Sequence, residues 1–134
     1  MSDTEAVLFA NEAFYNAFRT KDFDALQAIW SSDEKIACIH PGWLPIYGRD
    51  AVMKSWKNIL TGPNSPDIFC HGAAAHFLSD TAYFVTCFEN LAGGTMSATN
   101  IFLKEGGSWR IVHHHASPTI QNPPSISNDN SRLQ

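Results

Sequence analysis

The feature that most constrains this sequence is a change of pattern near its middle. Helical spacing of apolar residues gives way, between Asp67 and Ser117, to runs of aromatic and β-branched residues separated by short turn pairs. Such pairs at this spacing are typical of β-hairpin turns. We therefore predict four consecutive antiparallel strands in this half of the chain. The pairs that separate them are Ser79-Asp80, Gly93-Gly94 and Gly106-Gly107.

The first half of the chain carries helix signals. Ser2-Asp3-Thr4-Glu5 has the form of a capping box, and apolar residues follow it at helical spacing as far as Phe18. Asp22 can cap a second, shorter helix. A third helix is predicted over Arg49–Thr61, because Gly62-Pro63 is a typical stop signal.

A short apolar run at residues 36–39 predicts a strand between the second and third helices. It stops at His40-Pro41, because proline has no N–H to donate to a sheet. Residues 42–48 are predicted to form a loop. Helices followed by strands indicate an α+β domain with its helices on one face of an antiparallel sheet. The predicted domain covers residues 1–118. Residues 119–134 are rich in Ser, Asn and Pro and are predicted to be an extended or disordered tail.

Composition argues against several classes of protein. A chain of 134 residues with 44% apolar and 16% charged residues predicts one ordered domain. The net charge of −4, without a basic cluster, argues against a nucleic-acid partner. We find no signal-peptide pattern and no apolar run long enough for a membrane span, so neither secretion nor membrane insertion is expected. Three cysteines without a CxxC pair predict reduced thiols and a cytoplasmic protein.

Three segments carry a resemblance to a known family. They are the opening pair of helices; Ile39-His40-Pro41-Gly42-Trp43 with Tyr47-Gly48-Arg49 and Trp56; and residues 109–117, WRIVHHHAS, which are the most specific. Over about residues 4–118 the chain resembles the SnoaL-like branch of the NTF2-like superfamily, which includes ketosteroid isomerase and the association domain of calmodulin-dependent kinase II. The resemblance implies a cone-shaped fold, with three N-terminal helices packed on a curved antiparallel sheet, and a homodimer through the convex sheet face.

The same resemblance, combined with strand alternation, implies a set of pocket residues. It turns His114 and Glu89 into the cone, where a carboxylate beside an imidazole can form an acid/base pair titrating near neutral pH. Asn100 is expected to donate to a carbonyl oxygen of the ligand. His40 takes the position of the Asp-Pro general base of ketosteroid isomerase. The aromatic residues expected to form the walls and lid are Trp43, Tyr47, Trp56, Tyr83 and Phe102.

Plainer roles remain open for these residues. The pocket carboxylate, amide and imidazole can simply satisfy one another, as buried polar groups must. His40 can end its strand by bonding to a nearby carbonyl. The isomerase pattern is not reproduced, because Phe14 stands at the position of the first-helix tyrosine, with Tyr15 one residue away, and Asn100 replaces the protonated carboxylic acid. Steroid isomerase activity is therefore not predicted.

The run His113-His114-His115 permits two interpretations. Neighbouring strand residues face opposite sides, so the three rings cannot hold one ion, and His113 with His115 would need a third ligand such as His71 or His76. The favoured interpretation is a dimer interface, and neither a metal nor a cofactor is expected. The residues expected in that interface, on the convex sheet face, are Trp109, Ile111, His113 and His115.

Two classes of function follow from these observations. The first is the binding of a small, partly apolar molecule that bears a carbonyl or carboxylate, with isomerase, dehydratase or hydrolase activity as the acid/base chemistry such a pocket supports. The alternative is a non-catalytic module that assembles subunits or receives a partner peptide. An open pocket favours the first class, whereas a cone filled by Trp43, Trp56 and Phe102 favours the second.

Overall fold

The computed structural model describes residues 1–121 and 123 of the chain. Within these residues it contains three helices and six strands. The helices are α1 (Asp3–Arg19), α2 (Phe23–Ile29) and α3 (Arg49–Thr61). The strands are β1 (Ala37–Ile39), β2 (Ile46–Tyr47), β3 (Phe69–Ser79), β4 (Ala82–Leu91), β5 (Gly94–Glu105) and β6 (Ser108–Pro118).

Local signals account for where the helices begin. The Ser2 hydroxyl accepts the Glu5 N–H at 3.1 Å, and the Glu5 carboxylate accepts the Ser2 N–H at 3.0 Å, which completes the predicted capping box. Asp22 accepts the Ala25 N–H at 3.1 Å and caps α2. Gly48 precedes α3 with a φ of 88°, a conformation that glycine adopts without strain. All three predicted helices are confirmed.

The six strands form one sheet in the order β2-β1-β6-β5-β4-β3. The run from β3 to β6 confirms the predicted antiparallel hairpins. The prediction of an entirely antiparallel sheet is wrong, because β1 pairs with β6 in parallel. A parallel pair needs no hairpin and therefore leaves no turn signal in the sequence. The predicted strand between the second and third helices is confirmed as β1, whereas β2 was not predicted and lies within the predicted loop.

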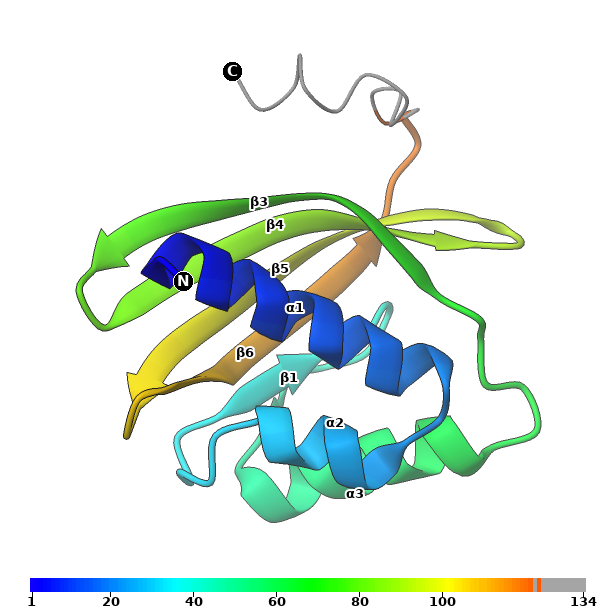
Figure 1. Cartoon of the computed structure of the whole chain (residues 1–134). Helices are drawn as coiled ribbons and strands as arrows, with labels where there is room; N and C mark the ends of the chain where they lie inside the picture. The colour runs from blue at the N-terminus through cyan, green and yellow to red at the C-terminus, as the bar shows by residue number, and fades with distance from the viewer. Residues whose placement is uncertain (122, 124–134) are drawn as a thin grey trace.

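Within residues 1–121 and 123, all three helices lie on one face of the sheet and none lies over the opposite face (Figure 1). The pairing register shifts at three places, two on β3 and one on β6. On β3 the register shifts around Gly72, whose φ of 66° suits a bulge. On β6, Val112 is an extra residue, since Ile111 and His113 pair with consecutive residues of β5. The sheet therefore curves over α1.

The bulge on β6 exchanges the two faces of that strand. Before it, Trp109 and Ile111 are buried on the helix side; after it, His114 is buried on the same side. The prediction that Trp109 and Ile111 share the convex face with His113 and His115 is therefore wrong, because one inserted residue reverses the alternation. His113 remains half-buried and His115 exposed on the outer face.

Aromatic side chains hold α1 and α3 together beneath the sheet. The Trp56 indole packs edge-on against Phe14 and Phe18 of α1, with ring centroids 5.4 and 5.0 Å apart. It also contacts the ring of His40 at 4.7 Å, where β1 ends. Edge-to-face contacts of this kind favour a fixed orientation of the rings. Trp56 thus joins both helices to the end of β1.

Two further sequence predictions concern the C-terminal tail and membrane insertion. Most of the predicted tail, at residues 122 and 124–134, lies outside the residues that the structure describes. Within residues 1–121 and 123, none of the helices combines the length and apolar character needed to cross a lipid bilayer.

Candidate functional site

A cavity of about 400 Å³ opens near the hairpin that joins β4 to β5. Glu89 and His114, both deeply buried, form its floor, and the partly exposed segment between α3 and β3 forms its mouth. Its volume is typical of a small-molecule site, and the cone is therefore open instead of filled by aromatic side chains. The residues lining it are Phe18, His40, Pro41, Trp43, Trp56, Asn58, Ile59, 62–66, Ile68, Glu89, Leu91, Met96 and His114.

Glu89 is the central polar group of the floor. Its surface is only 2% exposed, and the Tyr15 hydroxyl donates to Glu89 Oε2 at 2.6 Å. The Tyr15 oxygen in turn accepts from Asn100 Nδ2 at 3.2 Å and from the Cys87 thiol at 3.4 Å. Because other groups donate to this oxygen, the tyrosine proton is directed at the carboxyl. The hydrogen bond from Tyr15 thus fixes the Glu89 carboxyl, which also lines the cavity.

The hydrogen-bond directions determine the tautomer of His114. The Asn100 amide nitrogen donates to Asn11 Oδ1 at 2.9 Å and to Tyr15, so Asn100 Oδ1 is the accepting atom. His114 Nδ1 lies 2.5 Å from that oxygen and must donate its hydrogen. His114 Nε2 therefore keeps a free lone pair, and it lies 3.8 Å from Glu89 Oε2. The two asparagines aim an unprotonated ring nitrogen toward the carboxyl.

His40 is held in the opposite tautomer. The Ser55 hydroxyl donates to the Val52 carbonyl at 2.7 Å, so its oxygen must accept from His40 Nε2 at 2.9 Å. This bond to a hydroxyl replaces the predicted bond to a carbonyl. The His40 ring packs edge-on against Trp43 and Trp56, with centroids 4.9 and 4.7 Å apart. Its Nδ1 is left as an acceptor.

Burial separates the pKa values of the floor groups. It raises the pKa of Glu89 from 4.5 to about 7, although the hydrogen bond from Tyr15 acts in the opposite direction. Burial lowers the pKa of His114 to about 3 and the pKa of His40 to about 4. Between about pH 4 and pH 7 the carboxyl therefore carries a proton while both imidazoles are neutral. A proton donor and a proton acceptor then lie side by side, the arrangement that acid/base chemistry needs.

Five of the predicted site residues meet at the cavity. Glu89, His114 and His40 supply its polar groups, and Trp43 and Trp56 supply aromatic walls. Trp56 is fully buried, whereas Trp43 is 52% exposed at the mouth. None of the free cysteines Cys38, Cys70 and Cys87 lines the cavity, although the Cys87 thiol bonds to Tyr15 behind it.

Asn100 reaches the site only through His114. It is completely buried, it does not line the cavity, and both of its polar atoms are engaged with protein groups. The prediction that Asn100 donates to a ligand oxygen is therefore replaced by a positioning role for this side chain. The resemblance, combined with strand alternation, correctly predicted that Asn100 faces the helices. Alternation carries no information on which neighbour the side chain contacts.

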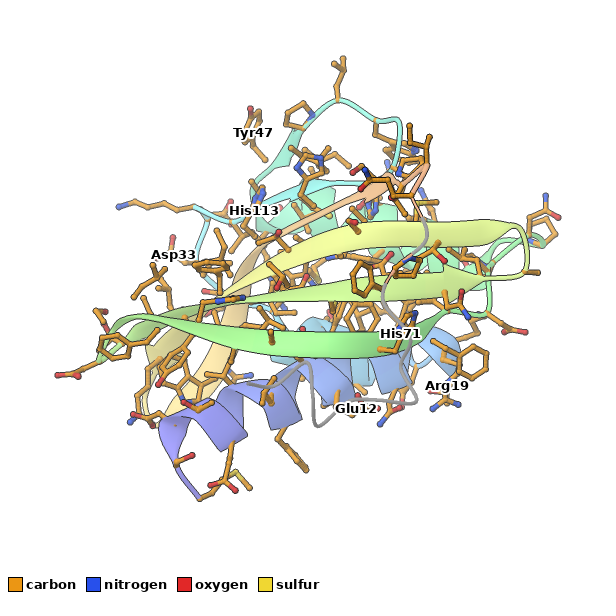
Figure 2. The ribbon with its side chains drawn as sticks, turned by 90° about the horizontal axis from the view of Figure 1, so that it is seen from above. Glu12, Arg19, Asp33, Tyr47, His71 and His113 are labelled. Carbon is orange, nitrogen blue, oxygen red and sulfur yellow. The ribbon has the colours of Figure 1, made fainter. Side chains whose placement is uncertain are left out.

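Three predicted aromatic residues do not line the cavity. Tyr47 is 72% exposed on β2, at the sheet edge opposite α1 in Figure 2. Tyr83 bonds to the Thr4 hydroxyl at 3.2 Å, six residues before Glu89 on β4. Phe102 is fully buried in the core. Tyr83 and Phe102 face the predicted side of the sheet, but a face does not specify the distance along a strand from the cavity.

Sequence reasoning missed three residues that complete the site: Tyr15, Asn11 and Ser55. Tyr15 and Asn11 lie four residues apart on α1 and therefore share one helix face, which meets Glu89 and Asn100. Polar side chains within the otherwise apolar stripe of this helix were the available signal. Ser55 left no comparable signal.

The metal interpretation gains no support from the described residues. No three of their His, Cys, Asp and Glu side chains gather in a cluster suited to an ion. The rings of His113 and His115 are 6.3 Å apart on the outer face, and His76 is bonded to Thr86 at 3.0 Å.

The chain matches a known protein family. Residues 7–121 match the family model of the SnoaL-like domain. The chain belongs to the SnoaL-like family. The matched residues include the whole network from Asn11 to His114, so the site of this SnoaL-like protein lies entirely within the family domain.

Solved structures show the NTF2-like fold of the family. A candidate dehydratase of the NTF2-like family from Streptomyces avermitilis is 31% identical, with a TM-score of 0.80 and coverage of 89% of this chain and 97% of that one. A candidate association domain of calcium/calmodulin-dependent protein kinase type II from Thiobacillus denitrificans is also 31% identical, with a TM-score of 0.71 and coverage of 82% and 92%. A cystatin-like protein from Caulobacter vibrioides, at 15% identity and a TM-score of 0.75 with 96% coverage of both chains, shares the fold.

A curated plant relative extends the comparison. F-box protein SKIP8 of Arabidopsis thaliana is 28% identical over 115 residues, which are 85% of this chain and 50% of the plant protein. The SnoaL-like chain therefore spans half the length of the curated relative that it matches.

Proposed function

We propose that this SnoaL-like protein binds a small, partly apolar carbonyl compound in its cavity and catalyses proton transfer next to the carbonyl group. The observation that carries the proposal is the pairing of Glu89 with His114 at the cavity floor, their Oε2 and Nε2 atoms 3.8 Å apart. Burial holds the carboxyl protonated and the imidazole neutral near pH 6, so the two groups have opposite roles.

The two groups act together on a ketone. Glu89 donates its proton to the carbonyl oxygen while His114 Nε2 removes a proton from the adjacent carbon, whose C–H electrons form the new C=C bond. The product is an enol beside a carboxylate and an imidazolium. If the ligand carries a C=C bond conjugated with the enol, the imidazolium can return its proton to the far carbon of that bond while the enol O–H returns its proton to Glu89, and the ligand is isomerised. If the imidazolium proton goes instead to a β-hydroxyl group, the enol O–H returns its proton to Glu89, the C=O bond re-forms, water leaves and an α,β-unsaturated carbonyl compound results.

Dehydration has additional support among the relatives. The Streptomyces avermitilis structure, 31% identical, is described as a candidate dehydratase. Elimination of water from a β-hydroxy carbonyl compound uses the same first step, namely removal of the proton next to the carbonyl. The paired acid and base of this chain supply that step without another reactant.

The test measures proton transfer without requiring the natural substrate. The protein is incubated in deuterated buffer near pD 7 with 4-phenylcyclohexanone, and deuterium uptake next to the carbonyl is followed by NMR. Positioned acid/base groups contribute roughly 100- to 10,000-fold in rate, so we expect uptake well above the buffer rate. Glu89→Gln should abolish the gain. Glu12→Gln, which removes an exposed carboxylate of α1, serves as the matched control. Uptake that survives Glu89→Gln would contradict the proposal.

We also propose that two copies associate through the uncovered sheet face, the face seen in Figure 2. Alternation turns Phe84, Phe88 and Ile101 outward, and in the single chain they are half-buried. Together with His113 they form an uncharged surface that repeats on a second copy without repulsion, as a twofold interface requires. The Thiobacillus denitrificans relative, described as a candidate association domain, supports a surface of this kind.

Native mass spectrometry of the freshly purified protein tests this association. We expect a dimer, and Ile101→Lys should convert it to a monomer, because the interface would then bury two unpaired charges. Ala51→Lys, on the exposed side of α3, should remain dimeric. A monomeric wild-type protein would refute the proposed interface. The three free cysteines accord with the reducing, cytoplasmic location that we propose alongside it.

A further inference from the structure

The charges around the cavity bear on which ligands can enter it. Among the described residues that line it, none is a lysine or arginine, and Glu89 is the one acidic residue. The two lining histidines, His40 and His114, are neutral at physiological pH because burial lowers the pKa of both. An anionic ligand would therefore meet no positive partner there.

The mouth adds a second unfavourable element for anions. Helix α3 ends at Thr61, and the next residue, Gly62, lines the cavity. A Cβ placed on Gly62 would lie 3.0 Å from the Asn58 carbonyl oxygen and 3.7 Å from that of Ile59, so carbonyls of the last turn of α3 lie close to the mouth. The carboxyl end of a helix carries partial negative charge. Both the floor and the mouth thus disfavour a carboxylate.

Two uncharged polar groups of residues that line the cavity have no hydrogen-bond partner within the described part of the chain. They are the indole N–H of Trp56, which is fully buried, and the hydroxyl of Ser65. Buried polar groups in native proteins almost always find partners, but both of these atoms are closed off from solvent within the wall, so a ligand reaches them only if the wall shifts.

We infer that the cavity selects uncharged carbonyl compounds and rejects carboxylates of the same shape. The inference deepens the proposed function and rests on it for the position of the carbonyl beside Glu89. An uncharged carbonyl compound enters the cavity without a charge to desolvate, and below about pH 7 its oxygen can accept a hydrogen bond from protonated Glu89. A carboxylate would instead be transferred from water into a largely apolar cavity beside Glu89, without a counter-ion.

Binding of two matched probes tests this selectivity. They are 4-phenylcyclohexanecarboxamide and 4-phenylcyclohexanecarboxylate, which share their shape and differ in charge, measured by isothermal titration calorimetry at pH 8. We expect the carboxamide to bind at least tenfold more tightly. As the pH is lowered toward 5.5, the ratio of the two affinities should fall toward one, because the probe acid and Glu89, whose pKa is about 7, both become uncharged.

A lysine placed in the wall provides the complementary test. Met96 lines the cavity, so Met96→Lys should raise carboxylate affinity relative to carboxamide affinity at least tenfold. Thr81→Lys adds the same charge on the exposed turn between β3 and β4, at the other end of β4 from Glu89, and should leave the ratio unchanged.

The outcomes separate this inference from the proposed function. If the carboxylate binds as tightly as the carboxamide at pH 8, the selectivity is refuted, whatever the deuterium assay shows. If the carboxamide binds preferentially but deuterium uptake stays at the buffer rate, the selectivity stands and the proposed catalysis fails. Binding of neither probe overturns both.

Discussion

Replacing Glu89 by glutamine should stabilise this protein while it removes the proposed activity. The substitution keeps the shape of the side chain and an oxygen that can accept the Tyr15 hydroxyl, which bonds to Glu89 at 2.6 Å. It removes the negative charge that Glu89 acquires above pH 7 in a site where its surface is 2% exposed. The variant therefore shows how much the buried charge lowers the unfolding free energy and whether the proposed activity needs the carboxyl group.

The expected magnitude follows from the pKa of the carboxyl. Burial raises that pKa from 4.5 to about 7, so folding is favoured by the protonated form and loses stability as the pH rises through this interval. The whole interval corresponds to about 3 kcal/mol of unfolding free energy. Since part of the loss has already occurred at pH 5, Glu89→Gln should gain about 2 to 3 kcal/mol more over wild type at pH 9 than at pH 5.

Urea unfolding followed by tryptophan fluorescence at pH 5 and pH 9 measures this difference. Glu12→Gln, on the exposed side of α1, should change the unfolding free energy by less than about 0.5 kcal/mol at either pH. If Glu89→Gln changes the unfolding free energy equally at both pH values, burial does not raise the pKa of Glu89. The proposed acid/base roles would then lose their physical basis. A stabilised but inactive variant would show that the buried carboxyl is kept at the expense of stability.

Three further predictions concern the groups around Glu89. Tyr15→Phe removes a hydrogen bond that lowers the pKa of Glu89, so that pKa should rise further in ¹³C NMR titrations, and unfolding free energy should fall by about 1 to 3 kcal/mol. ¹⁵N NMR of the wild-type protein should show His114 protonated at Nδ1. Asn100→Leu should shift this tautomer balance and lower the unfolding free energy by about 2 kcal/mol. A wild-type ring protonated at Nε2 would contradict the network. Burial lowers the pKa of His40 from 6.5 to about 4, so its contribution to stability is present above pH 6.5 and is lost as the pH falls. Between pH 7 and pH 5, His40→Gln should therefore lose about 2 kcal/mol less than wild type in urea unfolding.

The helices and hairpins could be predicted because their signals are local. The capping box at Ser2, the cap at Asp22 and the glycine after α3 each act within one helical turn. The turn pairs of the second half likewise act between neighbouring strands. Alternation also turned Glu89 and Asn100 toward the helices, because β4 and the inner half of β5 run without a bulge at those residues.

The error on β6 arose because one inserted residue reverses the alternation between the two halves of the strand. The extra residue Val112 returned Trp109 and Ile111 to the core, although the residues on either side of it read as one uninterrupted strand. No composition signal marks such a bulge, because its position depends on how β6 fits against β5 and the helices. His114 faced the cavity as predicted because it lies beyond that point.

The sequence by itself predicted the three helices and five of the six strands, and its resemblance to a known family predicted the side of the sheet on which Glu89 and His114 lie. The tertiary structure alone decided that Tyr15 meets a carboxyl 74 residues away and that Asn100 directs the proton of His114. It also decided the direction in which each pKa moves. Contacts between distant residues, and the loss of water that accompanies them, exist only after the elements have packed, and these two effects raise the pKa of Glu89 and lower that of His114.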